Sequence, residues 1–224
     1  MRKVLFLFLF MTVMASSMQA QEDSIRAKAM YCMSYADFQA DRWIPLDTLY
    51  LKTVSKSHRF WLGGNDFNLT TGNEELDKRI KKEAFAVLYH DSLLVNCRNL
   101  RYQKTGFGPG YTLGLRYQGS RLCIINRLIG KKAAMNQAMA GFMFGAIGGG
   151  LAAAEALKDL RCYVLGEEDE KGRINIQLIN DDFMEGLKAN YSGLYGQYRF
   201  VSDEDKRQSA ARVLPLLQEW ELVK

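Results

Sequence analysis

Segments in which apolar and polar residues alternate recur along the chain in pairs, and each pair is joined by a short polar stretch. This pattern is typical of β-hairpins, because successive side chains of a strand point to opposite faces of a sheet. The clearest pair is joined by Gly119-Ser120, and a glycine at the first position of a two-residue loop predicts a type II′ turn. The strand pairs that we expect are 46–54 with 59–62, 85–89 with 93–97, 111–118 with 121–126, and 162–165 with 173–179.

Helical patterns separate these strand pairs. Thr71 and Glu74 fit a capping box, in which the two residues satisfy unpaired backbone N–H groups at the start of a helix. A second helix is expected near Asp182, and a third within residues 202–217, where Pro215 should kink or shorten it. The apolar stripe of the first helix consists of Leu76, Ile80 and Ala84.

Three tyrosines near the C-terminus would share one face of a helix: Tyr191, Tyr195 and Tyr198. Gly193 and Gly196 lie among them, and glycine weakens a helix interior. We therefore expect these tyrosines to pack in a core or an interface without a regular helix.

Together these patterns predict an α+β fold, in which an antiparallel sheet of β-hairpins packs against helices. Residues 21–224 are long enough to bury a core of their own, and no linker or low-complexity tract divides them. We expect a single domain over residues 21–224.

A run rich in glycine and alanine, residues 133–154, has no ionisable side chain. As a helix it would extend about 33 Å, which is enough to cross a hydrocarbon core of about 30 Å. Gly141, Gly145 and Gly149 recur at every fourth residue, a spacing that lets helices approach closely within a domain or between subunits. In a membrane-spanning helix, the basic residues before the run would favour the cytoplasmic side. The N-terminal export signal described below would instead place them on the opposite side, which argues against a spanning helix. We therefore expect a buried helix or helical hairpin, with membrane insertion as the alternative.

The first twenty residues have the pattern of a secretory signal peptide. Arg2 and Lys3 precede an apolar run over residues 4–13, and small residues lead to a cleavage site between Ala20 and Gln21. We expect residues 1–20 to be removed and the exported protein to reside in the periplasm or at the cell surface.

Charge argues against nucleic acid as a partner. The chain has 30 Lys and Arg against 25 Asp and Glu, and removal of Arg2 and Lys3 lowers the net charge from +5 to +3. The basic residues are scattered among acidic ones, without the basic stripe that nucleic-acid binding requires.

Four cysteines follow the expected cleavage site: Cys32, Cys97, Cys123 and Cys162. An even number in an exported protein permits disulfides. Cys97 and Cys123 fall in neighbouring hairpins and are the first pair that we expect. The alternative is that each cysteine is a small buried apolar residue.

The sequence contains no strong enzymatic motif. The two histidines, His58 and His90, belong to no zinc-protease pattern, and no Cys-x-x-Cys or Gly-x-Ser-x-Gly occurs. His90-Asp91-Ser92 contains the residue types of a hydrolytic triad, but adjacent residues cannot converge on one hydrogen-bond chain, so a turn is expected. Residues 148–153 match a dinucleotide fingerprint without the strand that should precede it. We expect no cofactor.

A polar stretch before the first helix resembles a calcium-binding loop only loosely. Its turn glycine comes one position late, and its last acid is an aspartate. We therefore expect a polar loop and no metal site here. The residues in question are Asp66, Asn68, Thr70 and Asp77.

Three Asp-Ser/Thr-aliphatic triplets resemble the acceptor motif of the general O-glycosylation pathway of Bacteroidota. The acceptor residues would be Ser24, Thr48 and Ser92, with Ser92 the first to be occupied if its turn is exposed.

Several segments resemble an uncharacterised family of exported Bacteroidota proteins. They are Trp43-Ile44-Pro45-Leu46-Asp47, Lys81-Lys82-Glu83-Ala84-Phe85-Ala86-Val87 continuing to Val95-Asn96-Cys97-Arg98-Asn99-Leu100-Arg101, and Phe142-Met143-Phe144-Gly145-Ala146-Ile147-Gly148-Gly149-Gly150. The resemblance covers about residues 43–217. It implies a domain of unknown function in the cell envelope, and it brings no activity, cofactor or catalytic residue with it.

The leading hypothesis is therefore a non-enzymatic envelope protein that binds another envelope protein or a glycan, or that assembles with copies of itself. One alternative is a membrane-associated protein that inserts residues 133–154. The other is a periplasmic hydrolase of unrecognised type, which would use His90 or His58 with a nearby carboxylate.

Overall fold

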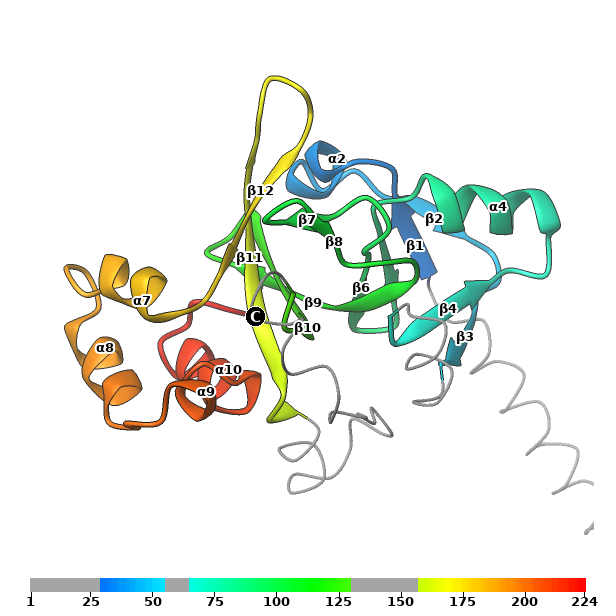
Figure 1. Ribbon diagram of the computed structural model, residues 1–224. Coiled ribbons are helices and arrows are strands. Elements are labelled where there is room, and N and C mark those ends of the chain that lie inside the picture. The colour runs from blue at the N-terminus through cyan, green and yellow to red at the C-terminus, as the bar shows by residue number, and fades with distance from the viewer. Residues whose placement is uncertain (1–28, 55–64, 130–156) are drawn as a thin grey trace, which may run out of the picture.

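An antiparallel sheet forms the centre of an α+β fold (Figure 1). The computed structural model describes residues 29–54, 65–129 and 157–224. Along its main path the strand order is β12-β11-β10-β9-β6-β5-β1-β2, and β4 joins β3 to β9 at the side. The strands are β1 Ala29–Cys32, β2 Ile44–Leu46, β3 Tyr50–Thr53, β4 Phe67–Thr70, β5 Ala86–Tyr89, β6 Ser92–Asn96, β9 Tyr111–Tyr117, β10 Arg121–Arg127, β11 Leu160–Glu168 and β12 Ile174–Leu178, with the small separate pair β7 Arg101–Tyr102 and β8 Thr105–Gly106.

Three of the predicted hairpins are confirmed: β5 with β6, β9 with β10, and β11 with β12. The turn between β9 and β10 differs from the prediction. Tyr117 pairs with Arg121, so three residues form the loop. Gln118 and Gly119 both have positive φ, 44° and 83°. The left-handed conformation therefore begins one residue earlier than a type II′ turn at Gly119-Ser120 requires.

The fourth predicted hairpin is wrong in its first strand. The segment 46–54 is divided between β2, which pairs with β1, and β3, which pairs with β4. Strand β4 occupies the segment that we expected to be a polar loop. Its exposed Asn68 and Thr70 alternate with the buried Phe67 and half-buried Leu69, so β4 is a strand with one apolar face.

Helices cover the sheet. They are α2 Tyr35–Gln39, α4 Glu74–Lys82, α7 Asp181–Leu187, α8 Ser192–Arg199, α9 Glu204–Arg207 and α10 Ala210–Glu219. The predicted helices near residues 74 and 182 are confirmed, and the one expected within 202–217 is divided into α9 and α10. Pro215 lies inside α10, yet the helix continues to Glu219.

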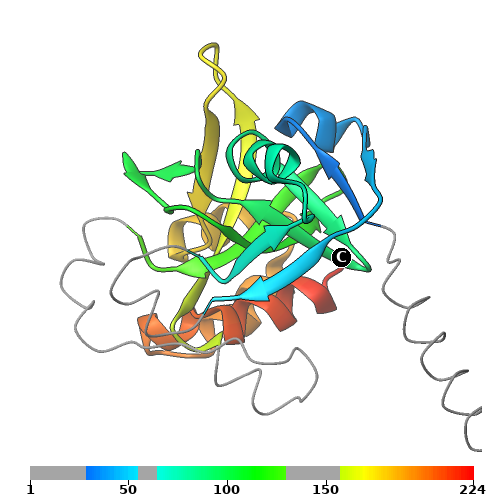
Figure 2. The ribbon, with the colours of Figure 1, turned by 90° about the vertical axis from the view of Figure 1, so that its right-hand side faces the viewer.

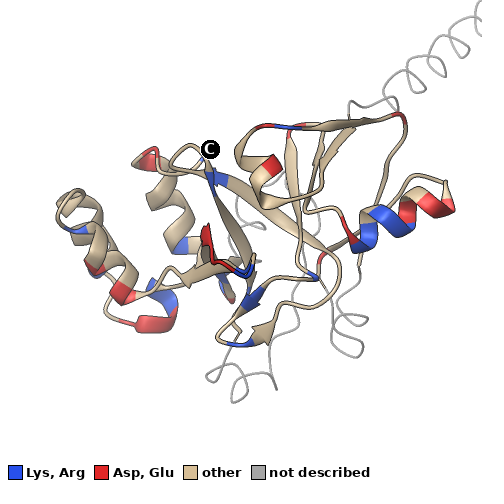
Figure 3. Cartoon of the chain, turned by 90° about the horizontal axis from the view of Figure 1, so that it is seen from above, with Lys and Arg blue, Asp and Glu red and all other residues tan. Residues whose placement is uncertain are grey.

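The N-cap of α4 differs from the predicted capping box. Asn73 is the N-cap, and its side-chain oxygen accepts hydrogen bonds from the backbone N–H groups of Glu75 and Leu76. Thr71 instead binds the carboxylate of Asp77 through its hydroxyl and its backbone N–H. Acidic side chains at the start of α4 and basic ones at its end match the helix dipole (Figure 3).

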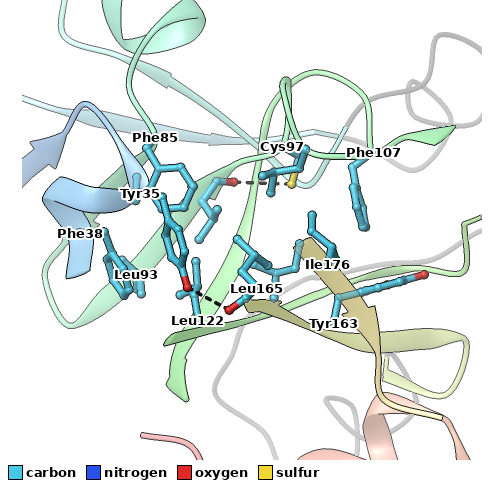
Figure 4. Packing of buried hydrophobic residues seen from close by; sticks show 14 of the residues in the cluster. Tyr35, Phe38, Phe85, Leu93, Cys97, Phe107, Leu122, Tyr163, Leu165 and Ile176 are labelled. Carbon is cyan, nitrogen blue, oxygen red and sulfur yellow. Dashed lines mark hydrogen bonds between the residues drawn. The ribbon is translucent and has the colours of Figure 1, made fainter. Parts of the chain in front are cut away.

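Two cores lie on one face of the sheet and a third on the other. The α2 core includes Tyr35, Phe38, Phe85, Leu122, Ile124, Tyr163 and Leu165. Aromatic rings fill much of it, and the Tyr35 hydroxyl donates to the carbonyl oxygen of Leu165 at 2.9 Å (Figure 4). The opposite face carries the helical core under α7–α10, with Cys123, Ile125, Cys162, Val164, Tyr198 and Leu217. It also carries the α4 core, with Val87, Leu94, Ile80 and Tyr111.

Strands β10 and β11 are covered on both faces because their residues alternate between the α2 core and the helical core. Figure 2 shows α10, in red, running below the strands of the sheet. The chain's last residues return to the sheet, where Val223 bridges to Tyr117 of β9.

Some predictions lie outside the described residues. These are the signal peptide with its Ala20–Gln21 site, Ser24, His58, the strand at 59–62, and the glycine-alanine run 133–154 with Gly141, Gly145 and Gly149.

Candidate docking face

The structure does not bring Cys97 and Cys123 together. Cys97 belongs to the α2 core and Cys123 to the helical core, so the sheet separates the two thiols. The pairing was predicted from neighbouring hairpins, but successive residues of a strand alternate between faces, and this alternation separates the two side chains. All four cysteines are buried with free thiols, as the alternative interpretation expected.

These thiols are poor nucleophiles. Desolvation by burial raises the pKa of Cys97, and likewise that of Cys32, to about 12. A thiol in that range stays protonated at neutral pH, and the thiolate is the reactive form. Cys162 contacts Cys123 across β10 and β11, and this contact with burial raises the pKa of Cys162 well above its usual value.

His90 lies in an exposed turn, as the sequence predicted. His90 and Asp91 form the loop between β5 and β6, where Tyr89 pairs with Ser92. The φ of His90 is 51°, and its ring contacts the edge of Tyr89 at 4.5 Å between centroids. Of the glycosylation residues, Ser92 and Thr48 are both half-buried.

The acidic residues of the stretch from Asp66 to Asp77 are engaged in hydrogen bonds within the fold. Asp66 accepts from the hydroxyl of Thr112 at 3.3 Å. Asp77 accepts from the hydroxyls of Thr70 and Thr71, and these bonds hold β4 to the start of α4. Within residues 29–54, 65–129 and 157–224, no three His, Cys, Asp or Glu side chains gather closely enough to hold a metal ion.

A partly buried ion pair fixes α7 against α9. Arg207, with only 7% of its side chain exposed, donates to both carboxylate oxygens of Asp181, at 3.0 and 2.6 Å. The Tyr198 hydroxyl donates to the same carboxylate at 2.6 Å. Chiefly because of the Arg207 hydrogen bonds, the pKa of Asp181 falls to about 2. Arg207 also donates to the carbonyl oxygens of Val201 and Ser202, so its role is to hold the helices in place.

The surface of this helical layer is hollowed between α8 and α10. The hollow, which we call the α8–α10 groove, has a volume of about 510 Å³. It is lined by Gly196, Gln197, Phe200, Arg212, Pro215, Leu216 and Glu219.

The two glycines of α8 have different surroundings, and only Gly196 lines the groove. A Cβ at Gly193 would lie 2.8 Å from the ring of Trp220, so the missing side chain lets α8 approach the end of α10 closely. A Cβ at Gly196 would meet no atom within 4 Å, so that position leaves the groove open. The predicted disruption of the helix is therefore wrong: α8 is a regular helix. Tyr198 is buried and Tyr195 half-buried within it, and Tyr191 is half-buried at its N-cap.

Phe200 is the most exposed of the large apolar side chains in the described residues, at 88%. It follows the last residue of α8 and stands at the groove. One exposed apolar residue is common on a protein surface and indicates little by itself. An exposed aromatic ring beside a groove indicates more, because both features are typical of surfaces that bind a partner.

Charged groups border the groove. Arg212 donates from Nη2 to the carbonyl oxygen of Gln197 at 2.8 Å, and Glu219 accepts from the Gln197 side chain at 3.1 Å. The Nε of Arg212 is buried, and within the described part of the chain it has no hydrogen-bond partner. Gln197 thus holds a cation and an anion at opposite ends of α10.

Of the predicted site residues that the structure describes, none lines the groove. Phe200 carries no sequence signal, because nothing in the local pattern distinguishes an exposed phenylalanine from a buried one. Gly196 was noticed only as a weak helix residue.

In a comparison with known proteins, the chain matches a family whose function is unknown. The model that matches is that of the Family of unknown function (DUF6563), over residues 30–224. No curated protein and no solved structure matches the chain. In the part of the chain that the structure describes, none of the helices combines the length and apolar character that a membrane crossing needs.

Proposed function

The chain belongs to this family of unknown function, and we propose that it is an exported cell-envelope protein that works by binding or assembly, with the α8–α10 groove and Phe200 as its docking face. The observation that carries the proposal is the exposed Phe200 ring beside an open groove. Aromatic side chains are the residues that most often anchor protein–protein contacts.

The chemistry of the described residues favours binding over catalysis. The Cys32 and Cys97 thiols are held protonated by burial, and Asp181 is engaged by Arg207 and Tyr198. The groove offers an apolar floor with polar groups at its border, the usual composition of a contact between proteins.

The docking face can be tested by photo-crosslinking in cells that make the full chain. A photoreactive phenylalanine analogue at position 200 should give a discrete covalent adduct with another polypeptide. The matched control is the same analogue at Tyr50, an aromatic residue that is 51% exposed on β3, far from the groove. No adduct, or equal adducts at both positions, would refute the docking face.

Export and modification rest on the sequence and need one measurement. The intact mass of the protein from its native host should correspond to a chain that begins at Gln21. Glycan mass that disappears in Ser92→Ala would establish O-glycosylation at the β5–β6 turn. A mass equal to the unprocessed 224 residues would refute export by cleavage.

A further inference from the structure

The charges that line the α8–α10 groove indicate which kind of partner it binds. The side of α10 that lines the groove carries the half-buried Arg212 and the exposed Pro215 and Glu219, at the three- and four-residue spacing of one helix face. Arg212 and Glu219 carry opposite charges and lie about 10 Å apart along the helix. The midpoint between them falls between Pro215 and Leu216.

This arrangement is complementary to itself. If two α10 helices lie antiparallel across a two-fold axis at that midpoint, Arg212 of each copy faces Glu219 of the other. A two-fold interface requires a self-complementary patch of this kind, in which residue i contacts j and j contacts i. The uncharged Pro215 then lies at the axis, where no like charges meet.

The same two-fold axis would place Phe200 of each copy against the groove of the other copy. Phe200 stands at the border of the groove of its own copy, so rotation about an axis through the groove brings it over the groove of the second copy. Gly196 leaves room there, because beyond the adjacent backbone of α8 itself no atom lies within 4 Å of the position that its Cβ would occupy. Two Phe200 rings would be removed from water, with two Arg212–Glu219 pairs around them.

From this charge pattern we propose that the docking face binds a second copy of this chain, as a two-fold homodimer with antiparallel α10 helices. The inference rests on the proposed function, since it names the partner of the same groove.

The test is the oligomeric state of the purified, full-length processed protein, measured by sedimentation velocity across a dilution series. The wild type should form a dimer that dissociates on dilution, and Phe200→Ala should weaken it about 100-fold or more, because two aromatic anchors are lost. Tyr50→Ala should leave the dimer unchanged. A dimer that Phe200→Ala does not weaken would overturn the proposal.

A charge exchange tests the antiparallel orientation. Arg212→Glu alone and Glu219→Arg alone should each give monomers, because both pairs become repulsive. An equal mixture of the two variants should form a heterodimer, in which each acidic residue again faces a basic one. Unfolding curves of each variant check that the fold is kept. A mixture that stays monomeric although both variants are folded would overturn this arrangement.

The outcomes separate the two proposals. A protein that is monomeric at every concentration, yet crosslinks from position 200 to a different polypeptide, refutes the homodimer and leaves the docking face standing. Failure to crosslink to any polypeptide refutes the docking face itself.

Discussion

Single residues of the sheet show how closely its strands approach. Gly114 lies in β9 between β6 and β10, and a Cβ there would stand 2.6 Å from Cγ2 of Val95 and 3.2 Å from Cδ1 of Leu122. Both neighbours are fully buried, so neither can move freely. The absence of a side chain at this position is therefore part of the packing.

Gly114→Ala should destabilise the protein by about 1–3 kcal/mol, the usual cost of overpacking a core. Gly196→Ala is the matched control: it adds the same methyl group where there is space, in a helix, and should raise stability by up to about 1 kcal/mol. Urea unfolding of both variants measures the difference. Equal effects at the two glycines would contradict this account.

The Asp181–Arg207 pair should make stability depend on acid pH. The pKa of Asp181 is lowered from 3.8 to about 2 in the folded protein, so its contribution is fully present above 3.8 and is lost as the pH falls toward 2. Because its side chain is 34% exposed, we expect a discounted loss of roughly 1–2 kcal/mol.

Asp181→Asn removes this titration while keeping the size of the side chain. Between about pH 5 and pH 2, the free energy of unfolding of the wild type should fall by roughly 1–2 kcal/mol more than that of the variant. The other carboxylates titrate in both proteins and cancel in the comparison. Parallel pH profiles would show that Arg207 does not depress this pKa.

At the scale of elements, the N-terminus of α4 depends on its cap, Asn73, and mutation can test this dependence. Asn73→Ala should cost about 1 kcal/mol, because two backbone N–H groups lose their acceptor. Glu74→Gln should have a much smaller effect, since its pair with Lys78 is exposed. Thermal unfolding of the two variants separates Asn73 capping from the Thr71–Glu74 box; a larger effect at Glu74 would favour the box.

The sequence predicted those elements whose partners are close along the chain. β5–β6, β9–β10 and β11–β12 are hairpins, and alternation with turn residues is enough to identify them. β1 could not be placed in this way, because it lies between β2 and β5, and β5 begins more than fifty residues later. Local patterns carry no information on such pairings.

The candidate site was beyond prediction for a related reason. Phe200 and Pro215 come together only when α8 packs on α10, and the exposure of Phe200 depends on that packing. The cysteines illustrate the same limit, because which thiols share a face depends on strand register and not on hairpin order.

At the scale of the whole molecule, the helical layer and the sheet are joined at the end of the chain. Leu222 is 3% exposed in the helical core, and the backbone N–H of Gln118 donates to its carbonyl oxygen. Arg116 and Lys224 exchange two backbone hydrogen bonds at 3.0 Å. These contacts bind the segment after α10 to β9, so we expect one cooperative unit.

Leu222→Ala should lower the free energy of unfolding by about 2–4 kcal/mol through the cavity it leaves. If helices and sheet unfold together, tryptophan fluorescence and far-ultraviolet circular dichroism should give the same midpoint for this variant and for the wild type. Lys188→Ala, an exposed change on α7's C-cap, serves as the neutral control. Two separate transitions would show that the helical layer is an independent unit.

The pairing of Arg127 with Leu160 at one end of the β10–β11 ladder has a consequence for topology. The two residues that flank the stretch 128–159 therefore lie on neighbouring strands, about 5 Å apart. A single bilayer crossing would instead put its two ends on opposite sides, about 30 Å apart, with β10 and β11 in different aqueous compartments. Two crossings need about 40 residues, more than this stretch contains. With the Arg127–Leu160 pairing kept, a complete crossing between these two strands is therefore impossible, so that crossing the bilayer would require β10 and β11 to separate and the protein to refold.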